Sequence, residues 1–389
     1  MPSTRVLLVG LSTRALAESA VAAGFEVASV DAFADLDHPG CPALSLERDF
    51  GVPYAPEALV RSAATVRATA VSYVASLENH PGAVAELARG RALWGNGPAA
   101  LAGVRDPAAL ARALRDASLP ALALRATAPP PGSTARRQRW LLKPRASGGG
   151  HGIRPWRPGI AVRRSHVLQR RVDGTPVSLA FVADGAGALP FALSLQLAGE
   201  PALGASPFQY CGNIVARVGT PNAPWRSLLD RLAQTARALA KRFQLVGVNA
   251  VDAIVARDGT PYVTELNPRP SGSMELAERA FGFSVFGAHA AGCRGALPAF
   301  DLAAALGGAP AVGKAIVFAR HDVIVGDTRA WLDDPNVRDV PAPGTPIRAG
   351  QPICTVFAAA STSAACRAAL VRRARRTYVE LERGRRRSA

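Results

Sequence analysis

Three side chains that carry oxygen atoms lie close together in the stretch VDAIVARDGTPYVTELNPRPSGS, residues 251–273: Asp252, Glu265 and Asn267. A turn signal, Arg-Asp-Gly-Thr-Pro, separates two apolar runs and predicts a β-hairpin. Because side chains alternate between the faces of a strand, Glu265 and Asn267 point the same way, and the hairpin can bring Asp252 beside them. Such hard oxygen ligands suit Mg²⁺ on a nucleotide phosphate. Taken alone, the stretch also fits an ordinary surface hairpin.

A glycine-rich loop follows a lysine in RWLLKPRASGGGHGI, residues 139–153. Ser147, Gly148, Gly149 and Gly150 have little or no side chain, so their backbone N–H groups can approach phosphate oxygens closely. Lys143 ends the preceding predicted strand and can reach a phosphate as a point charge. The Walker pattern G-x-x-x-x-G-K-[ST] is absent. A flexible hairpin tip is the alternative for this loop.

The elements that must position these residues begin with a βαβ pattern. Residues 5–10 and 25–30 read as buried strands, residues 13–23 read as the helix between them, and residues 68–75 read as a further strand. This alternation predicts a parallel sheet. The pattern G-x-G-x-x-G is missing from the first turn, which argues against a dinucleotide site there.

The remaining chain alternates helices and strands without internal repeats. Asp106-Pro107 opens a predicted helix over 106–117, and a Pro-rich linker follows at 128–132. An amphipathic helix at 225–243 leads into the hairpin. Further strands are expected within 166–183 and near 314–319, 322–325 and 352–357, with a last helix at about 361–383.

Composition excludes several classes of protein. Hydrophobic residues make up 49% of the 389 residues, which indicates a folded chain with a sizeable core. Because no apolar run approaches membrane-spanning length and the first run is too short for a signal peptide, we expect no membrane association. The five cysteines show no C-x-x-C spacing, which argues against zinc or disulfides and fits a cytoplasmic location.

The formal net charge is +17, and arginine supplies nearly all of it because only three lysines occur. An Ala- and Arg-rich chain often reflects genome composition, and there is no basic stripe studded with aromatic residues. We therefore expect no nucleic-acid binding. The positive charge favours anionic ligands such as nucleotides or polycarboxylates.

The strand lysine, the glycine loop and the D…E.N hairpin, in this order, resemble the ATP-grasp superfamily, in particular a carboligase-like group and the carboxylate–amine ligases. The resemblance covers about residues 1–310, and its specific motifs lie in 141–153 and 247–273. It implies an α/β chain with a two-lobed α+β ATP-grasp domain. The implied parts are a Rossmann-like pre-ATP-grasp domain (1–97), a lid subdomain (98–165), a metal and substrate subdomain (166–310), and a small β-rich C-terminal region with a terminal helix (311–389).

The resemblance also implies ATP as cofactor, with one or two Mg²⁺ ions or Mn²⁺ in their place. Asp252, Glu265 and Asn267 would hold the metal. Lys143 would bind the α and β phosphates, and Arg105 stands where the family has an earlier phosphate-binding lysine. Two groups complete the nucleotide site: Ser147, Gly148, Gly149 and Gly150 over the terminal phosphates, and Gln169, Arg170, Arg171 and Val172 beside the adenine.

The substrate end follows the hairpin. Arg269 matches a position that holds the substrate carboxylate or the acyl-phosphate, so Arg269 and Lys143 are the implied catalytic residues. Ser271, Gly272 and Ser273 would line the acceptor end. Outside these motifs, Arg217 is our candidate for an anion contact. The chain departs from the family after Gly174, where many members have an acid that binds the ribose.

The resemblance implies that ATP phosphorylates a carboxylate and that an amine then displaces phosphate. A carboxylase that activates bicarbonate and a non-catalytic nucleotide-binding protein remain as alternatives. We expect small-molecule carboxylate and amine substrates, and a homodimer is the default assembly.

Overall fold

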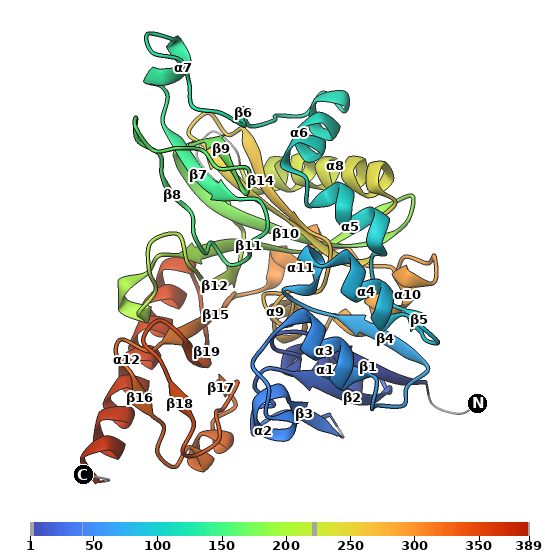
Figure 1. Ribbon diagram of the computed structural model, residues 1–389, viewed down its shortest axis with the longest axis vertical. Helices are drawn as coiled ribbons and strands as arrows, with labels where there is room; N and C mark the ends of the chain where they lie inside the picture. The colour runs from blue at the N-terminus through green and yellow to red at the C-terminus, as the bar shows by residue number, and fades with distance from the viewer. Residues whose placement is uncertain (1–3, 41, 220–223, 388–389) are drawn as a thin grey trace.

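The structure, a computed structural model, describes residues 4–40, 42–219 and 224–387. The N-terminal part is a five-stranded parallel sheet in the order β3-β2-β1-β4-β5 (Figure 1). Its strands are β1 (Arg5–Val9), β2 (Glu26–Asp31), β3 (Ala43–Ser45), β4 (Ala70–Tyr73) and β5 (Ala92–Leu93). Its helices are α1 (Arg14–Ala22), α2 (Leu46–Phe50), α3 (Pro56–Ala63), the 3₁₀ turn η1 (Leu77–Asn79) and α4 (Pro81–Leu87). The predicted βαβ start and parallel sheet are therefore confirmed.

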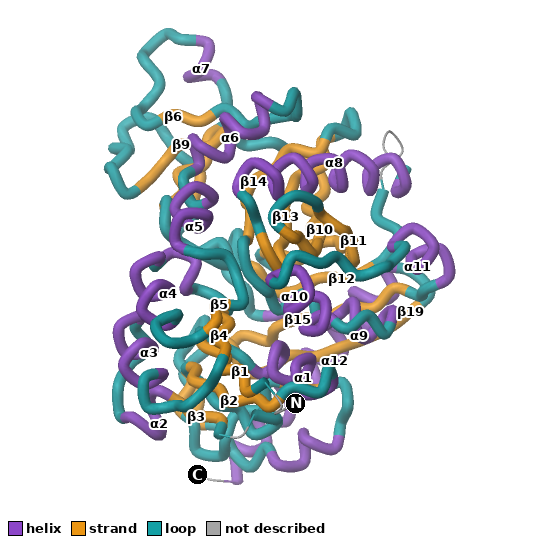
Figure 2. Tube along the Cα trace, turned by 90° about the vertical axis from the view of Figure 1, so that its right-hand side faces the viewer, coloured by secondary structure: helices purple, strands orange, loops and turns teal. Residues whose placement is uncertain are grey.

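Helices cover both faces of this sheet. Apolar residues of α3 and α4 pack on one face, and α1 packs on the other together with α10 (Val285–Cys293) from a later part of the chain (Figure 2). A parallel sheet needs this cover because both of its faces are apolar. The contact with α10 joins the N-terminal domain to the following domain.

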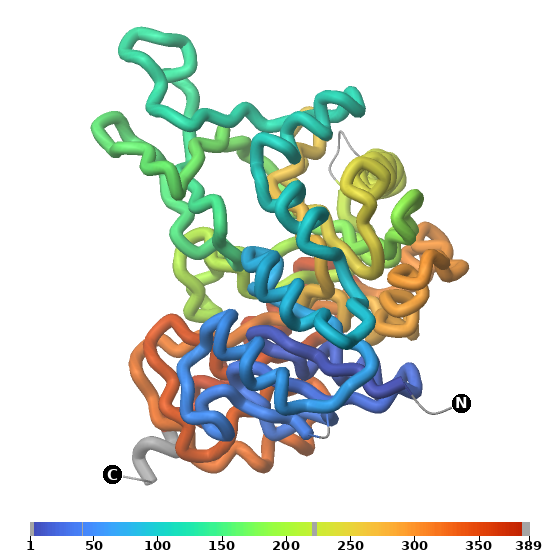
Figure 3. The backbone as a smooth tube through the Cα atoms, turned by 45° about the vertical axis from the view of Figure 1, so that its right-hand side comes forward, coloured from blue at the N-terminus to red at the C-terminus, as the bar shows by residue number. Residues whose placement is uncertain are grey.

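A second, four-stranded antiparallel sheet has the order β6-β9-β7-β8 and projects from the body of the molecule (Figures 1 and 3). We call it the lid sheet. Its strands are β6 (Leu124–Arg125), β7 (Trp140–Pro144), β8 (Arg154–Pro155) and β9 (His166–Arg170). The chain reaches it through α5 (Pro98–Val104) and α6 (Pro107–Asp116), and the short α7 (Thr134–Arg137) lies near its tip. Asp106 caps α6, as its sequence predicts, by accepting a hydrogen bond from the backbone N–H of Ala108.

The main sheet has eight strands in the order β14-β13-β10-β11-β12-β15-β19-β17. Its strands are β10 (Gly174–Asp184), β11 (Ala188–Ala198), β12 (Tyr210–Val215), β13 (Val246–Ala256), β14 (Pro261–Asn267), β15 (Ala311–Phe318), β17 (Val337–Arg338) and β19 (Pro352–Ala360). The predicted helix at 225–243 is α8 (Trp225–Phe243), which buries Leu228, Leu229, Leu232 and Ala236 in the largest core cluster, together with residues of β10, β11 and β13. Sequence and fold therefore agree on the helix that precedes the hairpin.

The C-terminal region continues the main sheet, because β15 pairs with β12 and β19 pairs with β15. The other elements here are β16 (Val323–Ile324), η3 (Arg329–Asp333), β18 (Pro346–Ile347) and α12 (Ser363–Arg387); η2 (Pro201–Leu203), α9 (Glu275–Phe281) and α11 (Leu302–Gly308) precede them. Figure 3 shows this region beside the N-terminal domain, on the side away from the lid sheet. Among the described helices, none combines the length and apolar character needed to span a membrane.

Candidate active site

The predicted metal ligands lie together on the hairpin of β13 and β14. Asp252 is directly opposite Glu265 in the strand register, and Asn267 is opposite Ala250. The side-chain amide Nδ2 of Asn267 donates to Asp252 Oδ2 at 3.0 Å. Across the described residues, no group of three or more His, Cys, Asp or Glu side chains is placed to hold a metal ion. The site therefore offers two carboxylates and an amide, which are hard oxygen ligands of the kind that Mg²⁺ prefers.

The two carboxylates differ in their electrostatic surroundings. Burial, with the charge of Glu265 as the next cause, raises the pKa of Asp252 above its ordinary value. Burial also pushes the pKa of Glu265 upward, but the charges of Lys143 and Arg105 outweigh it, so the pKa of Glu265 is lowered. Glu265 is therefore a stable anion, whereas Asp252 takes up a proton more readily.

Two cations face Glu265. Arg105 Nη1 donates to Glu265 Oε1 at 2.6 Å, and Lys143 Nζ lies 3.6 Å from Glu265 Oε2. Arg105 also donates from Nε to Asn79 Oδ1 at 2.8 Å and from Nη2 to the carbonyl of Ser147 at 2.6 Å. Arg105 therefore connects the N-terminal domain, the predicted metal ligand and the glycine loop. The family resemblance implies a phosphate contact for Arg105. Nothing in the sequence indicates its contact with Glu265.

The glycine loop lies against the segment that enters β12. Gly149 accepts a hydrogen bond from the backbone N–H of Tyr210 at 2.9 Å. Gly150 has a φ of +79°, and a Cβ atom there would lie 1.8 Å from the carbonyl oxygen of Phe208. A Cβ atom on Gly148 would meet nothing within 4 Å. Glycine is therefore sterically required at position 150 when the loop is in this closed arrangement.

An open pocket lies beside these residues. Leu110 and Leu114 of α6 and Leu124 of β6 contribute apolar lining, and polar lining comes from Arg105, Lys143, Arg145, Gln169 and Glu265. Gln169 Nε2 donates to the carbonyl of Thr264 at 3.4 Å, and Lys143 Nζ donates to the same oxygen at 3.1 Å. An apolar cavity with a few polar groups at its edge fits a nucleotide base and its phosphates.

The other predicted adenine contacts do not line this cavity. Arg170 and Arg171 are exposed, Arg171 Nε lies 3.4 Å from Asp173, and Val172 is half-buried. The contribution of α6 was missed, because its apolar stripe over 106–117 indicates only that one helix face is buried. Leu110 and Leu114 carry the signal at helical spacing, but nothing local tells a core contact from a ligand contact.

Arg269 is engaged by a buried carboxylate from the N-terminal domain. Its Nε and Nη2 donate to Glu78 Oε1 at 3.1 and 3.0 Å, and Nη2 lies 3.4 Å from Asn267 Oδ1. Glu78 is 1% exposed, and its Oε2 is buried without a hydrogen-bond partner among the described residues. Burial acts to lower the pKa of Arg269, but the charge of Glu78 outweighs it and the pKa is raised. Sequence reasoning missed Glu78, although a carboxylate just after a buried strand of a parallel sheet is a useful signal.

The predicted acceptor segment is held from the C-terminal region. Ser271 Oγ and Ser273 Oγ are 2.9 Å apart, and the carbonyl of Gly272 accepts from Lys314 Nζ at 2.7 Å. Lys314 is buried and also pairs with Glu275, the first residue of α9. Arg217 lies beyond the end of β12 and is exposed, with no hydrogen bond or ion pair to the site in the described chain. Its role as an anion contact stays a prediction.

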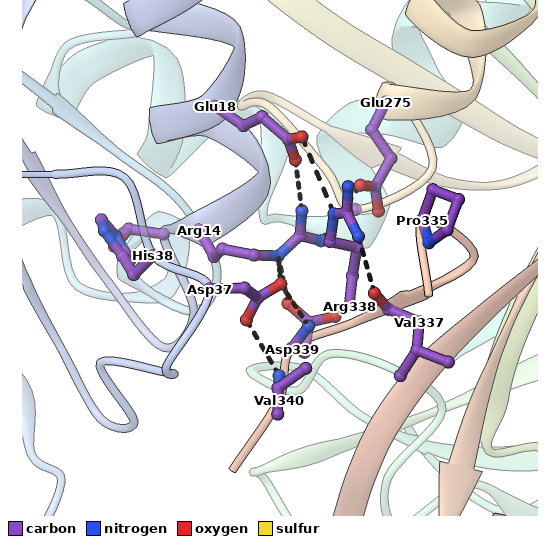
Figure 4. Close-up of polar contacts among 12 residues, drawn as sticks. Arg14, Glu18, Asp37, His38, Glu275, Pro335, Val337, Arg338, Asp339 and Val340 are labelled. Carbon is purple, nitrogen blue, oxygen red and sulfur yellow. Dashed lines mark hydrogen bonds and ion pairs between the residues drawn. The ribbon is translucent and has the colours of Figure 1, made fainter. Parts of the chain in front are cut away.

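Glu275 also belongs to a charge cluster around Arg14, the first residue of α1 (Figure 4). Arg14 is fully buried and contacts Glu18, Asp339 and Glu275 at 2.7, 2.7 and 3.0 Å. Asp37 accepts from the backbone N–H groups of Asp339 and Val340. Burial acts to raise the pKa of Asp339, but Arg14 and Lys314 lower it to about 2. The cluster joins the N-terminal domain, the start of α9 and the C-terminal region next to residues 271–273.

Residues 104–273 match the family model described as the ATP-grasp domain. This part of the chain is an ATP-grasp domain. No curated protein gives a significant match to this sequence. The resemblance to the ATP-grasp superfamily, predicted from Lys143, the glycine loop and the hairpin, is therefore confirmed.

Solved structures resemble the chain at low sequence identity. Pyruvate carboxylase from Rhizobium etli has a TM-score of 0.71 and 14% identity over 96% of this chain, which spans only 37% of that chain. The biotin carboxylase domain of 2-oxoglutarate carboxylase from Hydrogenobacter thermophilus has a TM-score of 0.65 and 13% identity, covering 92% of this chain and 86% of that one. Carboxyaminoimidazole ribonucleotide synthase from Aspergillus clavatus has a TM-score of 0.66 and 16% identity, covering 95% and 99%. At these identities the likeness shows the fold, with the N-terminal α/β domain, the ATP-grasp domain and the C-terminal region together.

Proposed function

We propose that the chain is an ADP-forming ligase that activates a carboxylate with ATP and joins it to an amine. The observation that carries the proposal is that Lys143 and Glu265 line one pocket of the ATP-grasp domain. Asp252 lies opposite Glu265 on the hairpin, and Arg105 joins Glu265 to the carbonyl of Ser147 in the glycine loop. Two of the similar structures support ATP as the nucleotide. The Aspergillus clavatus enzyme is complexed with ATP, and the Hydrogenobacter thermophilus domain is complexed with MgADP and bicarbonate.

Asp252, Glu265 and Asn267 would hold Mg²⁺, which would neutralise charge on the phosphate oxygens. Lys143 adds a fixed positive charge beside the same phosphates, and the closed glycine loop excludes water from the reactive intermediate. In the first step a carboxylate oxygen of the substrate attacks the γ-phosphorus, and ADP leaves. In the second step the amine nitrogen attacks the acyl carbon, phosphate leaves, and the nitrogen loses a proton. Phosphoryl transfer of this kind depends mainly on positioning and charge.

The proposal requires Arg105 to change partners. In the structure its guanidinium and the Lys143 ammonium neutralise Glu265. A divalent cation at Glu265 would be repelled by both groups at this distance. A triphosphate supplies the negative charge that draws Arg105 and Lys143 away from Glu265. Metal and nucleotide therefore bind together, and Arg105 acquires the phosphate contact that its sequence position suggests.

The test is release of ADP and phosphate from Mg-ATP across a panel of carboxylic acids, with and without amines, using Glu265→Gln as control. Turnover that needs both an acid and an amine, and is lost in the variant, is the expected result. Turnover that needs bicarbonate but no amine would instead identify the second candidate, a bicarbonate-activating carboxylase, which the bicarbonate complex of the Hydrogenobacter thermophilus domain favours. If the wild type does not bind ATP at all, the nucleotide site itself is wrong. The third candidate, a non-catalytic nucleotide-binding protein, then fails together with the ligase.

We further propose small-molecule substrates, a cytoplasmic location and a homodimer for this chain. The Hydrogenobacter thermophilus domain is described as a dimer. Sedimentation of the purified protein tests the assembly, and a single species at the monomer mass would overturn it.

A further inference from the structure

The positive charge of the chain is concentrated in one segment. Residues 117–172 contain twelve arginines and lysines and no aspartate or glutamate, so this segment accounts for twelve of the seventeen net charges. With 29 acidic residues in 389, a segment of 56 residues would hold about four at the chain average. A general preference for arginine explains added positive charge, but it does not explain the absence of acids. We call residues 117–172 the basic segment.

The basic segment forms the lid sheet and its connecting loops. Ion pairs that its basic residues make within the described chain reach acids outside it, at Asp106, Asp173 and Glu265. Most of its arginines are directed into solvent. The exposed ones are Arg137, Arg139, Arg154, Arg157, Arg163, Arg164, Arg170 and Arg171. The lid sheet therefore carries a large charge that its own residues do not neutralise.

The aromatic residues of the segment are in its core. Trp140 and Trp156 are 3% and 8% exposed and pack with Leu142 and Leu168. Single-stranded nucleic acids bind basic grooves that also present aromatic rings for stacking. The described surface of the lid sheet presents guanidinium groups without such rings. Its chemistry favours small, multiply charged anions over bases.

The same segment reaches into the nucleotide cavity. Lys143, Arg145 and Gln169 line it, and Arg105, just before the segment, lines it as well. A cleft bordered by charge of one sign raises the local concentration of an oppositely charged ligand and can raise its association rate by ~10- to ~10³-fold. The anion that this cavity suits is a nucleoside triphosphate, whose negative charge persists when Mg²⁺ is bound.

We propose that the basic segment is an electrostatic capture surface for the nucleoside triphosphate, with Arg157, Arg163 and Arg164 as association-rate determinants. This inference rests on the proposed function, because the captured anion is the substrate of the ligase. None of the three arginines lines the cavity. Their effect is on the association rate, and through it on the affinity, while the dissociation rate is unaffected. It weakens with added salt, since the Debye length falls from about 30 Å at 0.01 M to about 8 Å at 0.15 M.

The test is stopped-flow binding of a fluorescent ATP analogue with Mg²⁺, comparing wild type with the triple variant Arg157→Gln, Arg163→Gln, Arg164→Gln. If the three charges are assigned a distance of ~20 Å from a doubly negative nucleotide, screened Coulomb attraction gives an association rate lower by about threefold at 10 mM salt and about 1.2-fold at 150 mM. The dissociation rate should stay unchanged. The matched control removes the same charge elsewhere, at Arg61, Arg67 and Arg237, which are exposed and lie outside the segment.

An association rate equal to wild type in the lid variant, or an equal fall in the control variant, would overturn the inference. A second result would also overturn it: the wild type binds duplex DNA at 150 mM salt, the lid variant does not, and the two associate with nucleotide at the same rate. The surface would then bind nucleic acid. If the wild type binds no nucleotide at all, the proposed function fails. If it binds nucleotide at a rate that salt does not affect, only the capture surface fails.

Discussion

Replacement of Arg14 by methionine should destabilise the protein by about 3–5 kcal/mol near neutral pH, because it removes one partner from a buried ion-pair cluster. The Arg14 side chain is fully buried, and its guanidinium lies within 3.0 Å of Glu18, Glu275 and Asp339. Methionine keeps part of the apolar volume, so the loss is mainly electrostatic. Glu275 would be left buried, and Asp339 half-buried, with less compensating charge.

The effect of Arg14→Met should shrink as the pH falls. In the folded protein the pKa of Asp339 is about 2, below its ordinary value of 3.8. The corresponding stabilisation, ~2–3 kcal/mol, is fully present above about pH 4 and is lost as the pH falls through about 2. In the variant, burial acts without the opposing charge of Arg14, so the folded-state pKa values of the cluster rise. The variant then binds protons on folding, which partly offsets its defect under mildly acidic conditions.

Thermal unfolding measured at about pH 7.5 and about pH 5 tests this reasoning. Arg329→Met is the matched control, because Arg329 pairs with Asp327 on the surface and its side chain is 73% exposed. We expect Tm to fall by several degrees in Arg14→Met at the higher pH, by less at the lower pH, and not measurably in the control. A loss that is the same at both pH values, or no larger than in the control, would refute the electrostatic account.

Three further predictions concern the active site. Gly150→Ala should lower ATP turnover more than tenfold by preventing loop closure, whereas Gly148→Ala should retain activity; equal turnover in both variants would contradict the closed-loop geometry. Arg105→Met should weaken ATP binding by about tenfold or more, through loss of a charge-assisted contact, yet strengthen binding of free Mn²⁺ measured by electron paramagnetic resonance. Unchanged Mn²⁺ affinity would show that Arg105 does not compete with metal at Glu265. Because the pKa of Asp252 is raised, this carboxylate should take up a proton at a higher pH than an ordinary aspartate does. The KM for Mg²⁺ should therefore rise as the pH falls, and a KM that stays constant down to about pH 4 would contradict this.

The parts of the site that the sequence predicts are those that local rules govern. The hairpin follows from a turn signal between alternating strands, and β13 and β14 place Asp252 opposite Glu265 as expected. The glycine loop is predicted from residue type, because glycines let the backbone approach a phosphate closely. The structure adds that Gly150 also lies too close to Phe208 for any side chain. In these cases the signal is local, because it lies in the residue types of one loop or in the alternation along one strand pair.

The parts that escaped prediction depend on contacts between distant segments. Glu78 meets Arg269 across 191 residues of sequence, and Arg14 meets Asp339 across 325. No periodicity or motif links such pairs, because tertiary packing alone brings them together. The contact of Arg105 with Glu265 is similar, since the sequence indicates which charges are present but not how they pair without ligand. The attachment of the C-terminal strands to the main sheet through β12 and β15 also required the structure.

The central claim is that a substrate carboxylate is phosphorylated by ATP before an amine attacks it. Its most direct test uses the acid that supports turnover, labelled with a heavy oxygen isotope in its carboxylate, followed by mass spectrometry of the released phosphate. Our account predicts one labelled oxygen in each phosphate formed, with label transfer lost in Glu265→Gln. Phosphate that carries no label, released at the same rate as ADP, would contradict an acyl-phosphate intermediate and with it the proposed ligase.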